Sequence, residues 1–139
     1  MRQFLLLIGL LFLIGCSSGH DDTDNAPTGS YVGQNDDILV SMELTGGNCR
    51  RITAFNDRIV FCQYEKIATS GQYPDLSFSG DDFIISCKFA NGSVFSANAS
   101  GKLPNNVLGG KGYTDISGTY NFKKYDGVLD ANGDGILDQ

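Results

Sequence analysis

The residues with the clearest capacity for chemistry are side-chain oxygens near the C-terminal end of the sequence. Three of them alternate with other residues and are followed by a glycine at the position of a sharp turn. When such a segment curls, alternate oxygens converge on one point, and a backbone carbonyl adds another, which suits a hard cation such as calcium. We therefore predict a calcium site made by Asp130, Asn132, Asp134, the carbonyl of Ile136, and Asp138, with Asp126 as an additional candidate.

The same stretch, residues 126–139, resembles known calcium loops. Asp130-x-Asn132-x-Asp134-Gly135 matches the start of an EF-hand-type loop. The pattern from Asp126 to Asp130 recurs from Asp134 to Asp138, which is similar to the loops of dockerins and thrombospondin type 3 repeats. The sequence stops before position twelve, where such loops carry a bidentate carboxylate. The resemblance implies a weak affinity of about 10⁻⁴ to 10⁻³ M; the alternative is a frayed acidic tail.

A second chemical feature is Cys16, which follows an apolar run over residues 4–14 with Arg2 before it. As a helix, that run would cover about half of a bilayer's hydrocarbon core, so it is typical of a signal peptide rather than of a membrane span. Leu13-Ile14-Gly15-Cys16 resembles the bacterial lipobox. The resemblance implies cleavage of residues 1–15, lipidation of the Cys16 thiol and acylation of the new amine by a chain such as palmitate.

Lipidation would anchor the chain to the cell envelope. Ser17 after the cysteine resembles cargo of the outer membrane, if the cell is Gram-negative. Several acyl chains, at about 0.8 kcal/mol per buried CH₂, make such an anchor effectively permanent. Residues 16–28 are polar and acidic, so we expect a disordered tether there, and it contains His20, the only histidine.

The charges of the central part, residues 29–125, balance at nine basic and nine acidic residues. A segment without basic excess is unsuited to nucleic acid, because phosphate neutralisation dominates that binding. It also contains no histidine, so no Ser-His or Cys-His pair can form there. Neither a P-loop nor a dinucleotide-binding motif is present. We therefore predict that the protein is not an enzyme.

Three cysteines remain besides Cys16, and an oxidising envelope favours one disulfide with one spare thiol. We favour Cys49–Cys62 across a hairpin, and Cys62–Cys87 is the alternative. A short loop of this kind would stabilise the fold by about 2–3 kcal/mol. Near Cys49, the cluster of Arg50, Arg51 and Arg58 has two interpretations: recognition of an anionic partner, or solvated charges at a strand edge.

The elements that must position these residues are short strands joined by tight turns. Val40, Met42 and Leu44 alternate with polar residues, which is typical of a half-buried strand. Similar patterns predict strands at residues 38–45, 52–55, 58–67, 76–79, 83–89, 94–99 and 117–125. We expect one all-β domain over residues 29–125, a small antiparallel β-barrel or β-sandwich of about seven to eight strands.

The predicted core aromatics have two interpretations, ordinary packing or the lining of a cavity for a small apolar ligand. They are Phe55, Phe61, Phe78, Phe83, Phe89 and Phe95. Gly29-Ser30-Tyr31 and Gly118-Thr119-Tyr120 resemble the G-x-W opening of lipocalins, with tyrosine for tryptophan. Ser70-Gly71-Gln72-Tyr73 resembles the S-G-x-x-Y element of membrane-bound lysozyme inhibitors, one residue shorter.

Together these patterns predict a lipid-anchored lipoprotein of the cell envelope with a non-catalytic binding or structural β domain. Its partner would be a protein, a glycan or a small apolar ligand, besides the membrane that holds its lipid. Two alternatives stay open: a lipocalin-like carrier of a small apolar ligand, and a protein inhibitor of an enzyme such as lysozyme.

Overall fold

The computed structural model describes residues 26–90 and 93–138, and every regular element in this part of the chain is a strand. The ten strands are β1 (Gly29–Asn35), β2 (Ile38–Thr45), β3 (Asn48–Asn56), β4 (Ile59–Tyr64), β5 (Ala68–Gln72), β6 (Asp75–Ser79), β7 (Phe83–Phe89), β8 (Val94–Pro104), β9 (Tyr113–Asp115) and β10 (Gly118–Tyr125). The predicted all-β class is confirmed, with more strands than expected. Over the described ranges, no helix has the length and apolar character needed to cross a membrane.

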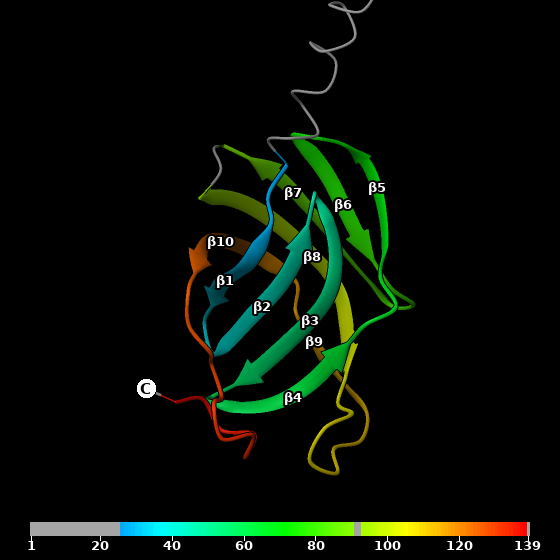
Figure 1. Cartoon of the computed structure of the whole chain (residues 1–139). Helices are drawn as coiled ribbons and strands as arrows, with labels where there is room; N and C mark the ends of the chain where they lie inside the picture. Colours follow the sequence, from blue (N-terminus) through cyan, green and yellow to red (C-terminus); the bar gives the residue numbers. More distant parts are fainter. Residues whose placement is uncertain (1–25, 91–92, 139) are drawn as a thin grey trace, which may run out of the picture.

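All neighbouring strands are antiparallel, in the order β4-β3-β2-β1-β10-β8-β7-β6-β5, with β9 beside β8. This sheet curls into a half-barrel, so that β5 comes to lie near β3, although the two are far apart in the sheet (Figure 1). The first and last long strands, β1 and β10, pair at its centre.

The strands absent from the sequence prediction lack a run of alternating apolar residues. β1 presents to the interior Tyr31, which is 1% exposed, and Gly33. A side chain at Gly33 would begin only 3.0 Å from the Phe122 ring, so glycine allows this close approach. β5 is a polar edge strand, and β9 has only three residues. Pairing with neighbours, rather than a local pattern, defines these strands.

The interior of the half-barrel is filled by side chains from both ends of the sheet. Rings contact one another there: Phe95 lies 5.3 Å from Tyr31, 4.3 Å from Phe89 and 5.0 Å from Phe122, measured between ring centroids. All six predicted core phenylalanines are buried, and five of them belong to this inner core. The sixth, Phe55, lies elsewhere.

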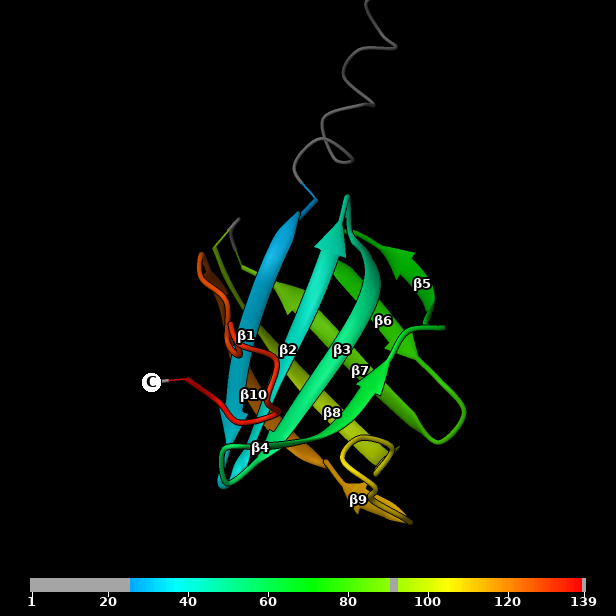
Figure 2. The same ribbon diagram turned by 60° about the horizontal axis from the view of Figure 1, so that its bottom comes forward.

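Phe55 belongs to a second apolar cluster, which lies on the outer face of the sheet. It packs with Val60 and with Leu137 of the C-terminal segment, as we call residues 126–138. Partly buried side chains of Leu39, Val107 and Leu129 join this cluster. Figure 2 shows the C-terminal segment lying across the outer face of β1 and β2. The acidic segment is therefore folded against the domain instead of frayed.

The last residues of the tether predicted for residues 16–28, namely 26–28, are packed against the domain. Pro27 is buried, and its carbonyl accepts a hydrogen bond of 3.0 Å from the amide of Gly47. The hydroxyl of Thr28 accepts another, of 2.8 Å, from the amide of Gly46. Residues 26–28 thus pack on the turn between β2 and β3 and belong to the domain.

The edge strand β4 is covered by other parts of the chain. The amide of Val60 donates to the carbonyl of Gly135 at 2.9 Å, and the amide of Leu137 donates to the carbonyl of Arg58 at 2.7 Å. Farther along the edge, the amide of Asn106 donates to the carbonyl of Phe61 at 2.8 Å. Covering an edge in this way prevents pairing with another chain.

Candidate binding groove

The outer face of the strands β10, β1, β2, β3 and β4 is organised in three rows of side chains, defined by strand pairing. The first row is Tyr125, Ser30, Glu43 and Arg51; the second is Lys123, Val32, Ser41, Thr53 and Gln63; the third is Gln34, Leu39, Phe55 and Val60. The third row is mostly apolar and lies under the C-terminal segment. The first two rows are mostly polar.

A groove of about 580 Å³ runs over these rows and opens to solvent. Its floor is mostly polar, with Ser30, Ser41, Glu43, Arg51, Thr53 and Gln63, and it includes the apolar Phe55 and Val60 of the third row. Its walls are mostly apolar and come from two segments outside the strands: Val107 and Leu108 in the loop between β8 and β9, and Val128, Leu129 and the acidic Asp130 in the C-terminal segment. The volume lies within the range of small-molecule sites.

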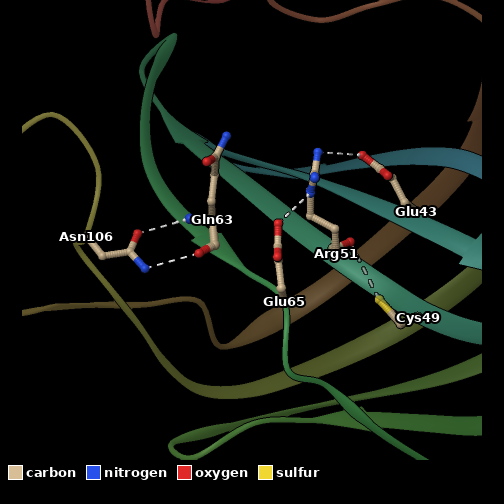
Figure 3. Close-up of polar contacts among 6 residues, drawn as sticks. All are labelled: Glu43, Cys49, Arg51, Gln63, Glu65 and Asn106. Atoms are coloured by element: carbon tan, nitrogen blue, oxygen red, sulfur yellow. Dashed lines mark hydrogen bonds and ion pairs between the residues drawn. The ribbon is translucent and has the colours of Figure 1, made fainter.

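Arg51 is held at the floor between two glutamates (Figure 3). Its Nη1 lies 3.5 Å from Oε2 of Glu43, and its Nε donates a 3.2 Å hydrogen bond to Oε2 of Glu65. The three side chains are about half exposed, so these ion pairs add little to stability and mainly fix the orientation of the side chains. The net charge of the trio is negative by one unit.

The fixed position of Arg51 changes one interpretation of the arginine cluster. Arg51 is shared by two carboxylates, and Nη2 of Arg58 donates to the carbonyl of Leu137. Both cationic groups are therefore engaged within the chain. A cluster of free cations for an anionic partner is not present at these two residues.

Gln63 is positioned by the side chain of Asn106, as Figure 3 shows. Oδ1 of Asn106 accepts a hydrogen bond of 3.0 Å from the backbone amide of Gln63, and its Nδ2 donates to the Gln63 carbonyl at 3.1 Å. Both bonds use the backbone of Gln63. Its side-chain amide is thus directed by a braced strand, without taking part in either bond.

Sequence analysis did not identify the groove residues Glu43, Gln63 and Tyr125, or Glu65, which pairs with Arg51 beside the groove. These residues could be identified only from the strand register around the turn at Gly46 and Gly47. A bulge between Glu43 and Leu44 shifts this register, so that Glu43 faces Arg51 instead of Arg50. Such a bulge is not visible in the sequence pattern.

The predicted calcium ligands do lie together in one curled loop. The two carboxylate oxygens of Asp130 accept hydrogen bonds from the amides of Asp134 at 3.2 Å and Gly135 at 2.7 Å. Oxygens of Asn132, Asp134 and Asp138 likewise accept hydrogen bonds from backbone amides of the same segment. The side-chain oxygens thus organise the loop by accepting hydrogen bonds from its own backbone amides.

Calcium binding by this loop stays a prediction. Within the described ranges, no group of three or more acidic, cysteine or histidine side chains is arranged to hold a metal ion. A bound ion would have to share or replace the amide hydrogen bonds of Asp130 and its neighbours. The role that the structure gives to these oxygens is to shape the segment that forms one wall of the groove.

Neither predicted disulfide is present, because Cys49, Cys62 and Cys87 are all free thiols, so both predictions are wrong. Cys62 pairs with Ala54, which is five residues along β3 from Cys49, a separation of about 16 Å at the usual rise of a strand. Disulfides need Cα atoms about 4.4–6.8 Å apart. Cys62 and Cys87 lie on β4 and β7, which do not pair.

The three thiols are buried in the inner core. Burial raises the pKa of Cys49 and of Cys62 to about 12. The pKa of the Cys87 thiol is raised by burial and, to a smaller extent, by the proximity of Cys49. Because only the thiolate is nucleophilic, these cysteines are inert in the folded chain.

Cys16, the signal peptide at 1–15 and most of the tether lie outside the described residues, so lipidation stays a prediction. Comparisons of the chain with protein-family models, with curated proteins and with solved structures give no match.

Proposed function

We propose that this chain is a lipid-anchored lipoprotein of the cell envelope, and that its β domain binds a ligand in the outer groove without catalysing a reaction. The observation that carries the binding part is the groove itself, in which polar side chains from the first two rows face apolar walls. Apolar walls with a few positioned polar groups are typical of ligand sites. The lipobox-like sequence ending at Cys16 supports the anchor.

Binding without catalysis is favoured by the chemistry of the floor. Ser30, Ser41 and Thr53 provide hydroxyls, but activating a hydroxyl as a nucleophile requires an adjacent base. The only histidine in the sequence is His20, which precedes the domain. The carboxylate of Glu43 is paired with the guanidinium of Arg51.

The carrier alternative has less support than the groove. A carrier of this kind needs a cavity lined by phenylalanines, whereas Phe89, Phe95 and Phe122 contact one another in ring pairs. The inhibitor alternative is favoured by one observation: Leu108, in the loop between β8 and β9, is 62% exposed. A protruding apolar side chain can act as the anchor of a protein interface. Failure of the purified chain to inhibit a panel of lysozymes would exclude this alternative as framed.

The groove is tested by filling it. Thr53→Tyr places a ring in the middle of the floor, and Ser86→Tyr is the matched control on the outer face of β7, away from the groove. A small-molecule library screened by ligand-observed NMR should give hits that Thr53→Tyr abolishes and Ser86→Tyr retains. Hits that both variants retain, or the absence of hits, would contradict binding in the groove.

The anchor is tested separately. Cells that express the chain should incorporate labelled palmitate into it and recover it in the membrane fraction. Cys16→Ser should abolish both, while Ser17→Ala should retain the label. Label in the Cys16→Ser variant would exclude lipidation at this residue.

A further inference from the structure

We propose that the ligand of the groove is an uncharged carbohydrate, a short oligosaccharide with free hydroxyl groups. This inference rests on the proposed function, since it names the chemical class of the ligand for the same groove. It follows from the donors and acceptors of the floor, from the pairing of Arg51 with two carboxylates, and from the position of its apolar walls.

Arg51 on the floor is a donor between two acceptors, Glu43 on the floor and Glu65 beside the groove. Arg51 uses Nε and Nη1 toward the glutamates, so Nη2 takes part in neither contact. Glu43 and Glu65 each contact Arg51 through Oε2, which leaves the second oxygen of each carboxylate outside these contacts. A hydroxyl group both donates and accepts hydrogen bonds, so neighbouring hydroxyls match this arrangement.

The charges of the trio disfavour ionic ligands. An anion that approached Arg51 would meet the carboxylates of Glu43 and Glu65 on both sides, and a cation that approached either carboxylate would compete with Arg51. Like charges at short range cost free energy, and competition with an existing half-exposed pair adds a smaller cost. A neutral ligand avoids both penalties.

The rest of the floor disfavours a purely apolar ligand. The hydroxyls of Ser30 and Thr53 and the amide of Gln63 form a polar surface beside the trio, next to the apolar third row with Phe55 and Val60. An apolar molecule placed over them would remove their contact with water and offer no hydrogen bond in return. A carbohydrate replaces those bonds with its own hydroxyls.

The apolar walls fit the faces of sugar rings, which carry C–H groups. Val128 is 66% exposed and Leu108 is 62% exposed, and they lie on the two wall segments. The ring of Tyr125, which is 38% exposed, stands at the end of the first row. Contact with these side chains would bury apolar surface on the ligand while its hydroxyls face the floor.

The test is calorimetric titration of the purified chain with named probes. The neutral probes are chitotetraose, cellotetraose and maltotetraose; the others are tetragalacturonate as an anion, tetralysine as a cation and octanoate as an apolar acid. We expect at least one neutral oligosaccharide to bind, with little dependence on salt concentration, and the charged probes and octanoate to bind at least about tenfold more weakly.

Three variants locate the binding. Gln63→Ala and Glu43→Gln should each weaken the neutral oligosaccharide about tenfold, and the control Ser86→Ala, on the outer face of β7, should leave it unchanged. Gln63 and Glu43 are surface residues, so their variants should fold, which circular dichroism checks. Oligosaccharide binding that none of these variants weakens would overturn the assignment to the groove.

The outcomes separate this inference from the proposed function. If tetralysine or octanoate binds, if Thr53→Tyr abolishes that binding, and if no sugar binds, the carbohydrate inference is overturned and the groove remains a ligand site. If no probe binds and the library screen also yields nothing, both are overturned.

Discussion

Replacing Leu137 by alanine should loosen the C-terminal segment from the sheet. Leu137 is 9% exposed and packs on Phe55 and Val60. The change removes about three methylene equivalents, or about 2.4 kcal/mol at about 0.8 kcal/mol each. We expect about 2 kcal/mol, at the low end of the range for buried leucine, because the segment can move into the vacated space at the protein surface.

The assay is hydrogen exchange at amides whose partners depend on this docking. The amide of Val60 donates to Gly135 and that of Leu137 donates to Arg58, both between the segment and the β3–β4 hairpin, and that of Asp138 donates to Leu129 within the docked segment. If the segment opens locally, a loss of about 2 kcal/mol makes these three amides exchange roughly 30-fold faster. Amides of β7, such as that of Ile85, should keep their protection, since Ile85 belongs to the inner core.

The matched control is Val128→Ala in the same segment. Val128 is 66% exposed, so its truncation should change exchange at the three amides by less than about threefold. Two results would refute the reasoning. One is an equal effect of Leu137→Ala and Val128→Ala. The other is an equal loss of protection at Ile85, which would mean that the segment and the inner core open as one unit.

Three further predictions concern titration, reactivity and metal. Burial raises the pKa of Cys49 to about 12 from an ordinary 9.0, and burial and Asp115 raise that of Tyr120 to about 12 from 10.0. The unfolded chain therefore loses these protons at a lower pH than the folded chain. Their contribution to the free energy of unfolding is complete below pH 9.0 and falls as the pH rises toward 12. A melting temperature that stays constant over this window would contradict the prediction. Iodoacetamide should label Cys49, Cys62 and Cys87 only after unfolding in denaturant without reductant, and unlabelled unfolded chain would indicate a disulfide. If the C-terminal loop binds calcium, a calcium concentration ten times the dissociation constant should raise the free energy of unfolding by about 1.4 kcal/mol relative to EDTA. Asp130→Asn should remove this gain. A melting temperature of the unsubstituted chain that calcium leaves unchanged would exclude the site.

The sequence predicts the inner face of the sheet well, because that face depends on local alternation. Val40, Met42 and Leu44 are buried as the pattern indicates, and so are Phe83 and Cys87. The alternation of apolar and polar residues along a strand indicates which side chains face the core. Strands β1 and β5 were missed because their pairing is decided by neighbours that are distant in the sequence.

The outer face could be predicted only in part. The oxygens of Asp130 and Asn132 were visible in the sequence, but their segment's packing on the sheet was not. Leu129 and Leu137 look like spacers between aspartates, and nothing local indicates that Phe55 lies opposite them. Contacts between segments so far apart are set by the complete fold, not by pattern.

The line between β5 and β3, which we call the seam of the half-barrel, is where solvent can first reach the interior. No strand pairing joins β5 to β3 in the described part of the chain; there the hydroxyl of Thr69 accepts a 3.4 Å hydrogen bond from the amide of Cys49. Elsewhere in the sheet, many backbone hydrogen bonds hold each pair of neighbouring strands together, so local opening should concentrate along this line. The amide of Cys49 donates the hydrogen bond that crosses this line, so its hydrogen-exchange rate would report local opening of the half-barrel.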